Sequence, residues 1–240
     1  MNTDHSYRAA FRAAFPRTVP VLAGFMFLGI AFGILLTSKG YAILWAPLMS
    51  LVVFAGSMQY VAISLLCAAF DPLAALLLSL TVNARHIFYG ISMLGRYKGM
   101  GKMKPFLIYT LCDETFSIVS SEIPEGVEPK KFYFAVSLLD YLYWASASLI
   151  GGVTGRILAG IEGFDTTGFD FVLTALFVVI LIDSCREREK RIPAVIGIGC
   201  TLICLLIFGA DHFIIPSMLA ICIVLAVYIK LAGGERHGNA

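Results

Sequence analysis

A single arginine stands inside a long apolar run of this sequence. Between Asp71 and Arg96 the chain reads PLAALLLSLTVNARHIFYGISMLG, and Arg85 is the one side chain there with a fixed charge. Placing an arginine near the middle of a bilayer costs about 2.5–3.5 kcal/mol on insertion scales. Such a residue is kept where it has a charged partner, a wet cavity or a ligand, so Arg85 predicts a functional site.

Asn83 and His86 flank this arginine. A helix break at Asn83 would leave a helix N-terminus near the midplane, which attracts a carboxylate through its N–H groups and dipole. Arg85 could clamp the same carboxylate with two hydrogen bonds, or it could pair with an intramembrane carboxylate and only hold the bundle together. His86 could relay protons, since histidine titrates near neutral pH, or it could be a hydrogen-bonded packing residue.

Three carboxylates in other apolar segments are candidate partners for Arg85 or candidate coupling groups. Asp113 and Glu114 are adjacent in the segment 105–121, so on a helix they point about 100° apart. Asp140 lies among aromatic residues in LLDYLYW, where it either serves the same purposes or is an interfacial residue beside an aromatic belt. A carboxylate buried at this depth can carry a proton or bind a cation.

A second polar group interrupts the segment 43–69, which contains FAGSMQY at positions 54–60. Gly56 and Ser57 could allow a close helix contact or a local unwinding that frees backbone carbonyls. Gln59 and Tyr60 follow at once, and an amide in hydrocarbon either lines a cavity or makes an interhelical hydrogen bond. These four residues are therefore candidates for the lining of the site.

The elements that must position these residues are membrane helices. Hydrophobic residues make up 59% of the 240 residues and charged residues 14%, against roughly 45–50% and about 25% in soluble domains. The sequence predicts an all-α, polytopic integral membrane helix bundle with seven or eight hydrophobic segments, one or two of them broken or re-entrant. The segments are 19–38, 43–69, 72–95, 105–121, 132–157, 169–184, 192–210 and 213–231.

The chain divides into a basic cytoplasmic or interfacial segment at 1–18, one transmembrane transport domain at 19–231 and a polar C-terminal tail at 232–240. Residues 6–16 place Arg8 and Arg12 four apart, which fits a short amphipathic helix on the membrane surface as well as it fits a frayed basic tail.

Positive charges predict the orientation, because short cytoplasmic loops are rich in lysine and arginine. The N-terminus, the loops 96–104 and 185–191 and the C-terminal tail are all basic and should be cytoplasmic, whereas the acidic loop 158–170 should lie outside. If every segment crossed once, the loop 96–104 would fall outside. We therefore expect the segments 72–95 and 105–121 to be broken or re-entrant, which is tolerated where the backbone is buried in protein or lines a cavity.

Several other classes of function are disfavoured. The sequence contains no GxSxG, HExxH or Walker A motif, so we expect neither an enzyme nor a cofactor. Its six cysteines include no CxxC pair and predict no metal site. The net charge of +2 is too small to suggest a nucleic-acid partner.

Three motifs together resemble the AzlC family, the large subunit of branched-chain amino-acid exporters. They are FAGSMQYVA at 54–62, NARHIFYG at 83–90 and DETFS at 113–117. The resemblance implies a multi-pass protein of the bacterial cytoplasmic (inner) membrane that works with a small hydrophobic AzlD-type subunit. It also implies export of valine, leucine, isoleucine and sometimes methionine. It supplies no role for any single residue.

The resulting hypothesis is a secondary transporter that exports branched-chain amino acids and is coupled to protons. Asn83 and Arg85 would hold the substrate carboxylate, and Asp113 or Glu114 would bind the ammonium or the coupling proton. The residues Gly56, Ser57, Gln59 and Tyr60 would line the site, with Asp140 and His86 as further coupling or ion-pair candidates. The alternatives are a channel for small solutes and a non-transporting scaffold or assembly subunit.

Overall fold

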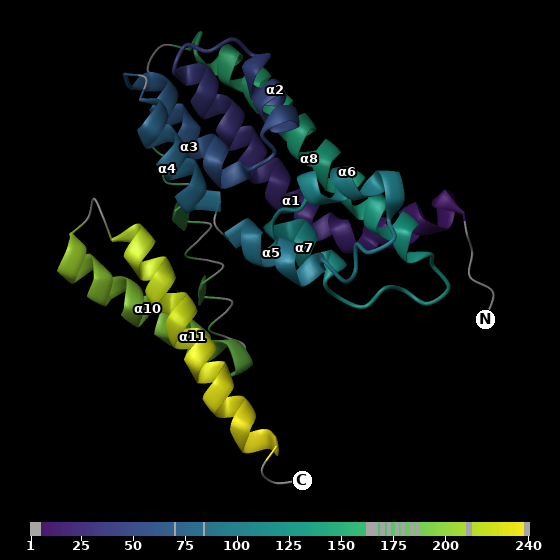
Figure 1. Cartoon of the computed structure of the whole chain (residues 1–240). Helices are drawn as coiled ribbons and strands as arrows, with labels where there is room; N and C mark the ends of the chain where they lie inside the picture. Colours follow the sequence, from purple (N-terminus) through teal and green to yellow (C-terminus); the bar gives the residue numbers. More distant parts are fainter. Residues whose placement is uncertain are drawn as a thin grey trace. The chain divides into compact units, whose positions relative to one another are not determined.

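The computed structural model describes residues 6–69, 71–83, 85–161, 188–209 and 213–237, with positions 168, 171, 174–175, 178, 181–182 and 185 between them. The chain forms two compact units, residues 1–173 and 174–240, each described here by itself. The regular structure of the described residues is helical, as predicted, and no strand occurs among them (Figure 1).

Two long helices, α1 (Tyr7–Ser38) and α8 (Pro129–Leu158), pack against one another and form the frame of the first unit. The ring of Phe25 contacts that of Trp144 at 5.2 Å between centroids. Closer to the start of α1, the ring of Tyr7 lies 6.3 Å from that of Phe134. Because contacting residues advance together along both helices, α1 and α8 run parallel. We call the end that holds Tyr7 the near end and the end that holds Ser38 the far end.

Glycines bring these two helices close together. A Cβ atom added at Gly33 would lie 2.5 Å from the carbonyl oxygen of Ser148 and closer still to the amide nitrogen of Gly152. An added Cβ at Gly151 would likewise collide with the backbone of Ile30. Small residues at helix contacts allow the backbones to approach in this way inside a bilayer, where burial against lipid supplies no driving force.

The basic N-terminal segment is part of α1 from Tyr7 onward, which corrects the expectation of a separate surface helix or a frayed tail. Ala10 and Ala14 are fully buried in the core of the near end. The helix continues through Pro16 and Pro20. Each proline removes one backbone hydrogen bond, yet the helix is uninterrupted at both positions.

The predicted segment 43–69 is two short helices, α2 (Trp45–Val52) and α3 (Gly56–Cys67), and does not cross as one span. The hydroxyl of Ser50 in α2 donates to that of Ser148 in α8 at 2.7 Å. The chain then turns back, and Tyr41, just beyond α1, donates to the carbonyl of Leu66 at 2.9 Å. The two helices therefore form a hairpin that enters from the far end and turns at residues 53–55.

A second hairpin, made of α6 (Lys104–Tyr109) and α7 (Asp113–Val119), enters from the near end. Phe106 packs against Phe134 near the start of α8, with ring centroids 5.6 Å apart. After a turn at residues 110–112 the chain runs back to the near end. There the side chain of Arg96 donates to the carbonyl of Val119, the last residue of α7, at 2.8 Å. The predicted break in the segment 105–121 is confirmed, and both ends of the resulting hairpin lie at the near end.

The helices α4 (Pro72–Asn83) and α5 (Arg85–Met93) carry the chain between the two hairpins. Asp71 and Tyr41 line one hollow at the far end, where α4 begins. Met93 and Tyr97 pack with Ala10 and Ala14 at the near end, where α5 finishes. The basic loop 96–104, which includes the short helix η1 (Gly101–Met103), thus lies at the same end as the N-terminus, as its charge predicted. Ala84 lies outside the described residues, so the break at Asn83 stays a prediction.

The second unit contains α10 (Arg188–Phe208) and α11 (Ile214–His237), which pack against one another. They correspond to the predicted segments 192–210 and 213–231, with α11 continuing into the predicted tail. The segment 169–184 falls mostly outside the described residues. Three described helices are long and apolar enough to cross a membrane, namely Tyr7–Ser38, Pro129–Leu158 and Arg191–Phe208. The count of seven or eight segments stays a prediction.

The close contact of α1 with α8 depends on the absence of a side chain at Gly33. Gly33→Ala should lower the melting temperature of the purified protein in detergent, because overpacking a tight contact costs about 1–3 kcal/mol. Gly24→Ala in the same helix is the matched control, since an added Cβ there meets no atom within 4 Å. Equal melting temperatures for the two variants would contradict the packing described here.

Candidate functional site

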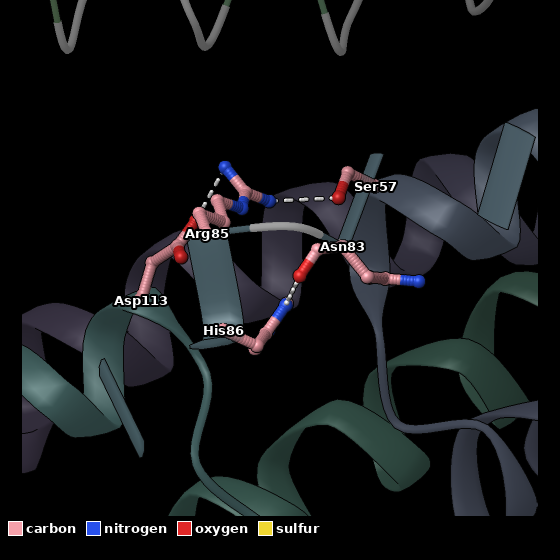
Figure 2. A network of polar contacts seen from close by, with 5 residues as sticks. All are labelled: Ser57, Asn83, Arg85, His86 and Asp113. Carbon is pink, nitrogen blue, oxygen red and sulfur yellow. Dashed lines mark hydrogen bonds and ion pairs between the residues drawn. The ribbon is translucent and has the colours of Figure 1, made fainter. Parts of the chain in front are cut away.

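Arg85 links the two hairpins (Figure 2). Its Nη1 atom lies 2.8 Å from Oδ2 of Asp113, and its Nη2 atom donates to Oγ of Ser57 at 2.7 Å. Ser57 belongs to the first turn of α3 and Asp113 to the first turn of α7. The side chains of Arg85 and Asp113 are 31% and 28% exposed, so the first unit covers the ion pair only partly.

Two helices begin beside this ion pair, α3 at Gly56 and α7 at Asp113. The first amides of a helix have no partner within it, and they make that end partially positive. Asp113 and Glu114 occupy the first turn of α7, where a negative charge is favourable. Arg85 is therefore a partly exposed cation that lies beside two carboxylates and the first turns of α3 and α7.

Asn83 and His86 contact each other beside Arg85. Nδ1 of His86 lies 3.1 Å from the backbone oxygen of Asn83, and the side chain of Asn83 points away from the guanidinium group (Figure 2). The Oδ1 atom of Asn83 is buried and has no hydrogen-bond partner among the described residues. The imidazole of His86 also packs on the ring of Tyr89, at 5.8 Å between centroids. This geometry matches the packing interpretation of His86.

The turn between α2 and α3 is fixed by hydroxyl groups that sequence reasoning did not select. The backbone oxygen of Leu51 accepts hydrogen bonds from Tyr109 at 2.5 Å and from Tyr141 at 2.8 Å. Phe54 has a φ of 44°, in the left-handed region, and its ring lies 5.1 Å from that of Tyr141. The tips of the two hairpins are thereby joined to each other and to α8.

Gln59 lies in a fully buried hydrogen-bond network between α2, α3 and α8. Its Oε1 accepts from the indole nitrogen of Trp144 at 2.7 Å, and its Nε2 donates to Ser50 at 3.0 Å. The hydroxyl of Ser148 completes the network by donating to the carbonyl of Trp144. Gln59 therefore makes the interhelical contact that was one of its two interpretations. The signal that could have found its partners is the presence of Ser50, Trp144 and Ser148 in apolar segments.

Gly56 and Tyr60 also face the frame helices. A Cβ atom added at Gly56 would lie 3.2 Å from the ring of Trp144. The hydroxyl of Tyr60 donates to the backbone oxygen of Leu28 at 2.7 Å, and its ring packs 5.7 Å from that of Phe32. Of the four residues predicted in this motif, the structure thus brings Ser57 to Arg85 and places the other three against α1 and α8.

Asp140 is fully buried, which corrects its interpretation as an interfacial residue. Its Oδ2 atom accepts a hydrogen bond from Thr115 at 2.8 Å. Trp144 is only 3% exposed and is part of the buried network, so this stretch of α8 is not an aromatic belt. The carboxylate that bonds Arg85 is that of Asp113, and Asp140 occupies a separate position on the other face of α7.

Comparison with known proteins identifies the family. The AzlC protein family model matches residues 20–158, which include all three motifs and the whole Arg85 cluster. The chain belongs to the AzlC family. It is 48% identical over 231 residues to the branched-chain amino acid transport protein AzlC of Bacillus subtilis (strain 168), covering 96% of this chain and 89% of that protein.

This AzlC protein is also similar to membrane proteins without an assigned activity. It is 39% identical over 222 residues to an uncharacterized membrane protein of Haemophilus influenzae, covering 92% of this chain and 89% of that one. It is 37% identical over 227 residues to one from Helicobacter pylori, covering 94% and 98%. No solved structure matches the chain. Membership of the family and a membrane setting are thus established for this AzlC protein.

The Gln59 network predicts a stability effect that is separate from substrate binding. Gln59→Leu should lower the melting temperature of the AzlC protein, because it leaves the buried Trp144 N–H without an acceptor, a loss of about 1–3 kcal/mol. The fraction that folds should keep the wild-type affinity for substrate. Unchanged stability with a weakened affinity would instead place Gln59 in contact with the substrate.

Proposed function

We propose that this AzlC protein is a secondary transporter that exports branched-chain amino acids across the bacterial cytoplasmic membrane. The observation that carries the proposal is Arg85, a partly exposed cation held between Ser57 and Asp113 where the two hairpins meet. The transport activity in the name of the Bacillus subtilis relative supports the same substrate class. Export, and valine, leucine, isoleucine or methionine as cargo, rest on the family resemblance.

The ion pair suits an amino acid because an amino acid is a zwitterion. A substrate that inserts between Arg85 and Asp113 gives its carboxylate to the guanidinium group and its ammonium to the carboxylate. One ion pair is thereby exchanged for two, and the bidentate geometry of arginine fits a carboxylate. Glu114, in the same turn of α7, is a second possible ligand for the ammonium group.

Apolar surface for an aliphatic side chain lies next to these charges. The rings of Tyr89 and Phe116 stack at 4.6 Å between centroids, and they belong to the helices that carry Arg85 and Asp113. On this geometry the substrate contacts are Arg85, Asp113 and Ser57, with Asn83 close by. Gly56, Gln59 and Tyr60 hold α3 in place, and His86 packs beside Asn83.

Substrate binding would also change the link between the hairpins. In the structure the hydrogen bond to Ser57 and the ion pair with Asp113 tie α3 to α7 through one side chain. A substrate that takes either contact loosens that tie. Opening of the site to one side of the membrane would then depend on the substrate, which is what a transporter requires of its binding residues.

The proposed orientation places the near end in the cytoplasm of a bacterial inner membrane. Arg8, Arg12 and Arg17 in the first half of α1 lie at the same end as the basic loop 96–104, and positive charge favours the cytoplasmic side. The small AzlD-type subunit is proposed as the partner from the resemblance, and protons are proposed as the coupling ions.

Arg85→Ala tests the substrate clamp. We expect loss of valine efflux from proteoliposomes, together with loss of the thermal stabilisation that bound valine gives to the purified protein. Arg156→Ala is the matched control, because Arg156 is exposed in the last turn of α8 and should leave both readouts unchanged. Normal efflux from well-folded Arg85→Ala protein would exclude the proposed role.

A scaffold in which the ion pair only holds α5 to α7 is the rival that the geometry favours most, because Arg85 already has a partner in Asp113. Exchanging the charges, as Arg85→Asp with Asp113→Arg, separates the two ideas. A structural pair should recover wild-type stability and complex formation in the double variant. If the pair binds substrate, the double variant should recover at most its stability and should not transport. The reversed charges face the wrong ends of the zwitterion and the dipole of α7.

The partner is tested by reconstitution. We expect valine efflux from vesicles that contain this chain with a co-encoded small hydrophobic subunit, and competition by leucine and isoleucine. Flux that neither saturates nor responds to these competitors would indicate a channel. Equal saturable efflux from this chain alone would show that the subunit is not needed for transport.

A further inference from the structure

Asp140 is a buried carboxyl group that the substrate cluster does not use. Its side chain is fully buried about halfway along α8, and its Oδ2 accepts from Thr115 at 2.8 Å. The second oxygen, Oδ1, has no hydrogen-bond partner in the part of the chain that the structure describes. Leaving a buried polar atom unpaired is unfavourable, and leaving a buried charge uncompensated is much more so.

Two hydroxyl groups in the same region also lack partners among the described residues. They are Oγ of Ser137 and the phenol of Tyr97, whose side chains are 0% and 2% exposed. Tyr133, Ser137 and Asp140 share one face of α8, because residues three, four and seven apart lie on the same side of a helix. The ring of Tyr97 packs on that of Tyr133 at 5.7 Å, which places both phenols on the near side of Asp140.

The elements around Asp140 bring no described cation to it. On α7 and its preceding turn the neighbouring titratable groups are Cys112, whose Sγ lies 3.2 Å from Oγ1 of Thr115, and Glu114. Tyr97 and Tyr133 are the titratable groups from the near end. The hydroxyl of Tyr109 in α6 donates to the backbone oxygen of Leu51.

The other basic groups of this unit have different positions. Arg85 bonds Asp113 and Ser57 at the tips of the hairpins. Arg17, the basic residue of α1 closest to this region, donates to the backbone oxygen of Glu122 at 2.6 Å and lies over the ring of Phe132. On either side of Arg17 the side chains of α1 that pack next to α8 are Ala14 and Thr18, which carry no charge.

We propose that Asp140 is the proton-binding group of this transporter, distinct from the substrate site, and that Tyr97 and Ser137 line the proton's route to it from the near end. A proton needs only one carboxylate oxygen, which Oδ1 offers. Hard metal cations instead take about six or more oxygen ligands, whereas a thiol and apolar side chains occupy much of this region. The inference rests on the proposed transport function.

The chain also offers a physical link between the two sites. Thr115, which donates to Asp140, lies two residues after Asp113, which pairs with Arg85, and both residues belong to the single short helix α7 (Asp113–Val119). Addition of a proton to Asp140 removes the charge that holds the Thr115 hydroxyl. A shift of α7 in response would move Asp113 relative to Arg85, so that proton and substrate binding bias the same element.

Asp140→Asn separates proton coupling from substrate binding. In proteoliposomes that contain this chain with its small subunit, we expect loss of valine accumulation driven by an imposed pH gradient. Exchange of labelled for unlabelled valine without a gradient should remain, because it needs the Arg85 site alone. Asp71→Asn at the exposed far end is the matched control and should keep both activities. Gradient-driven accumulation that survives in Asp140→Asn would overturn the proposal.

Infrared spectroscopy supplies a readout that does not depend on transport. The wild-type protein should show a protonated-carboxyl band that disappears as the pH is raised and that is absent from Asp140→Asn. Thr115→Val, which keeps Asp140 and removes its hydrogen bond, should shift that band, and this variant serves if Asp140→Asn does not fold. A band that neither variant alters would overturn the assignment to Asp140.

These outcomes are distinguishable from failure of the proposed function. If the protein does not transport amino acids, the wild type shows neither accumulation nor exchange, yet the infrared band still reports the protonation of Asp140. If the protein transports amino acids without using this group, the wild type and Asp140→Asn accumulate valine equally. A Ser137→Ala variant with unchanged rates of proton uptake would remove Ser137 from the route.

Discussion

Backbone groups that a helix leaves unpaired must find partners within the protein when no water can reach them. The first unit interrupts its helices at residues 53–55 and 110–112, and both interruptions lie beside the middle of α8. The freed carbonyl of Leu51 is satisfied by Tyr109 from the opposite hairpin and by Tyr141 from α8. Each hairpin thus depends on the other, and both depend on the frame.

The frame can support them because α1 and α8 are held rigidly together. Their glycines allow backbone contact, and the aromatic side chains of Phe25, Phe32 and Trp144 fill the space beside that contact. Trp144 also donates to Gln59, so the same residue that packs the frame positions α3. A disturbance of this packing would reach Ser57 through α3, and from there the guanidinium group of Arg85.

The sequence was informative where a charged residue lies in or beside a segment that is apolar enough to be buried in a membrane. Arg85 in an apolar run predicted a site, and the basic loop 96–104 predicted that the segments 72–95 and 105–121 are broken or re-entrant. The separate helices α6 and α7 confirm the break in 105–121, whereas the break in 72–95 stays a prediction. Both inferences rest on the cost of charge in hydrocarbon, which is large and local. The same reasoning left three carboxylates as partners for Arg85, because adjacent residues in a sequence do not reveal which helix faces which.

Other features required the three-dimensional structure. The segment 43–69 is long and apolar enough to suggest one span, and its reversal at residues 53–55 depends on hydroxyl groups from Tyr109 and Tyr141, far away in the sequence. Gln59 was expected beside the substrate, yet its neighbours Ser50 and Trp144 come from other helices. A polar residue in an apolar segment signals a partner, but its identity follows from tertiary packing.

The helices of the first unit follow one another in two sets of opposite orientation. Helix α1 runs from the near end to the far end, and the hairpin of α2 and α3 that follows it enters from the far end. Helices α4 and α5 lead back to the near end, and the hairpin of α6 and α7 that follows them enters from the near end. Helices α4 to α7 thus repeat the arrangement of α1 to α3 in the opposite orientation, although no repeat is visible in the sequence. Arg85 therefore contacts one hairpin of each orientation, α3 through Ser57 and α7 through Asp113, so its two bonds join the two sets.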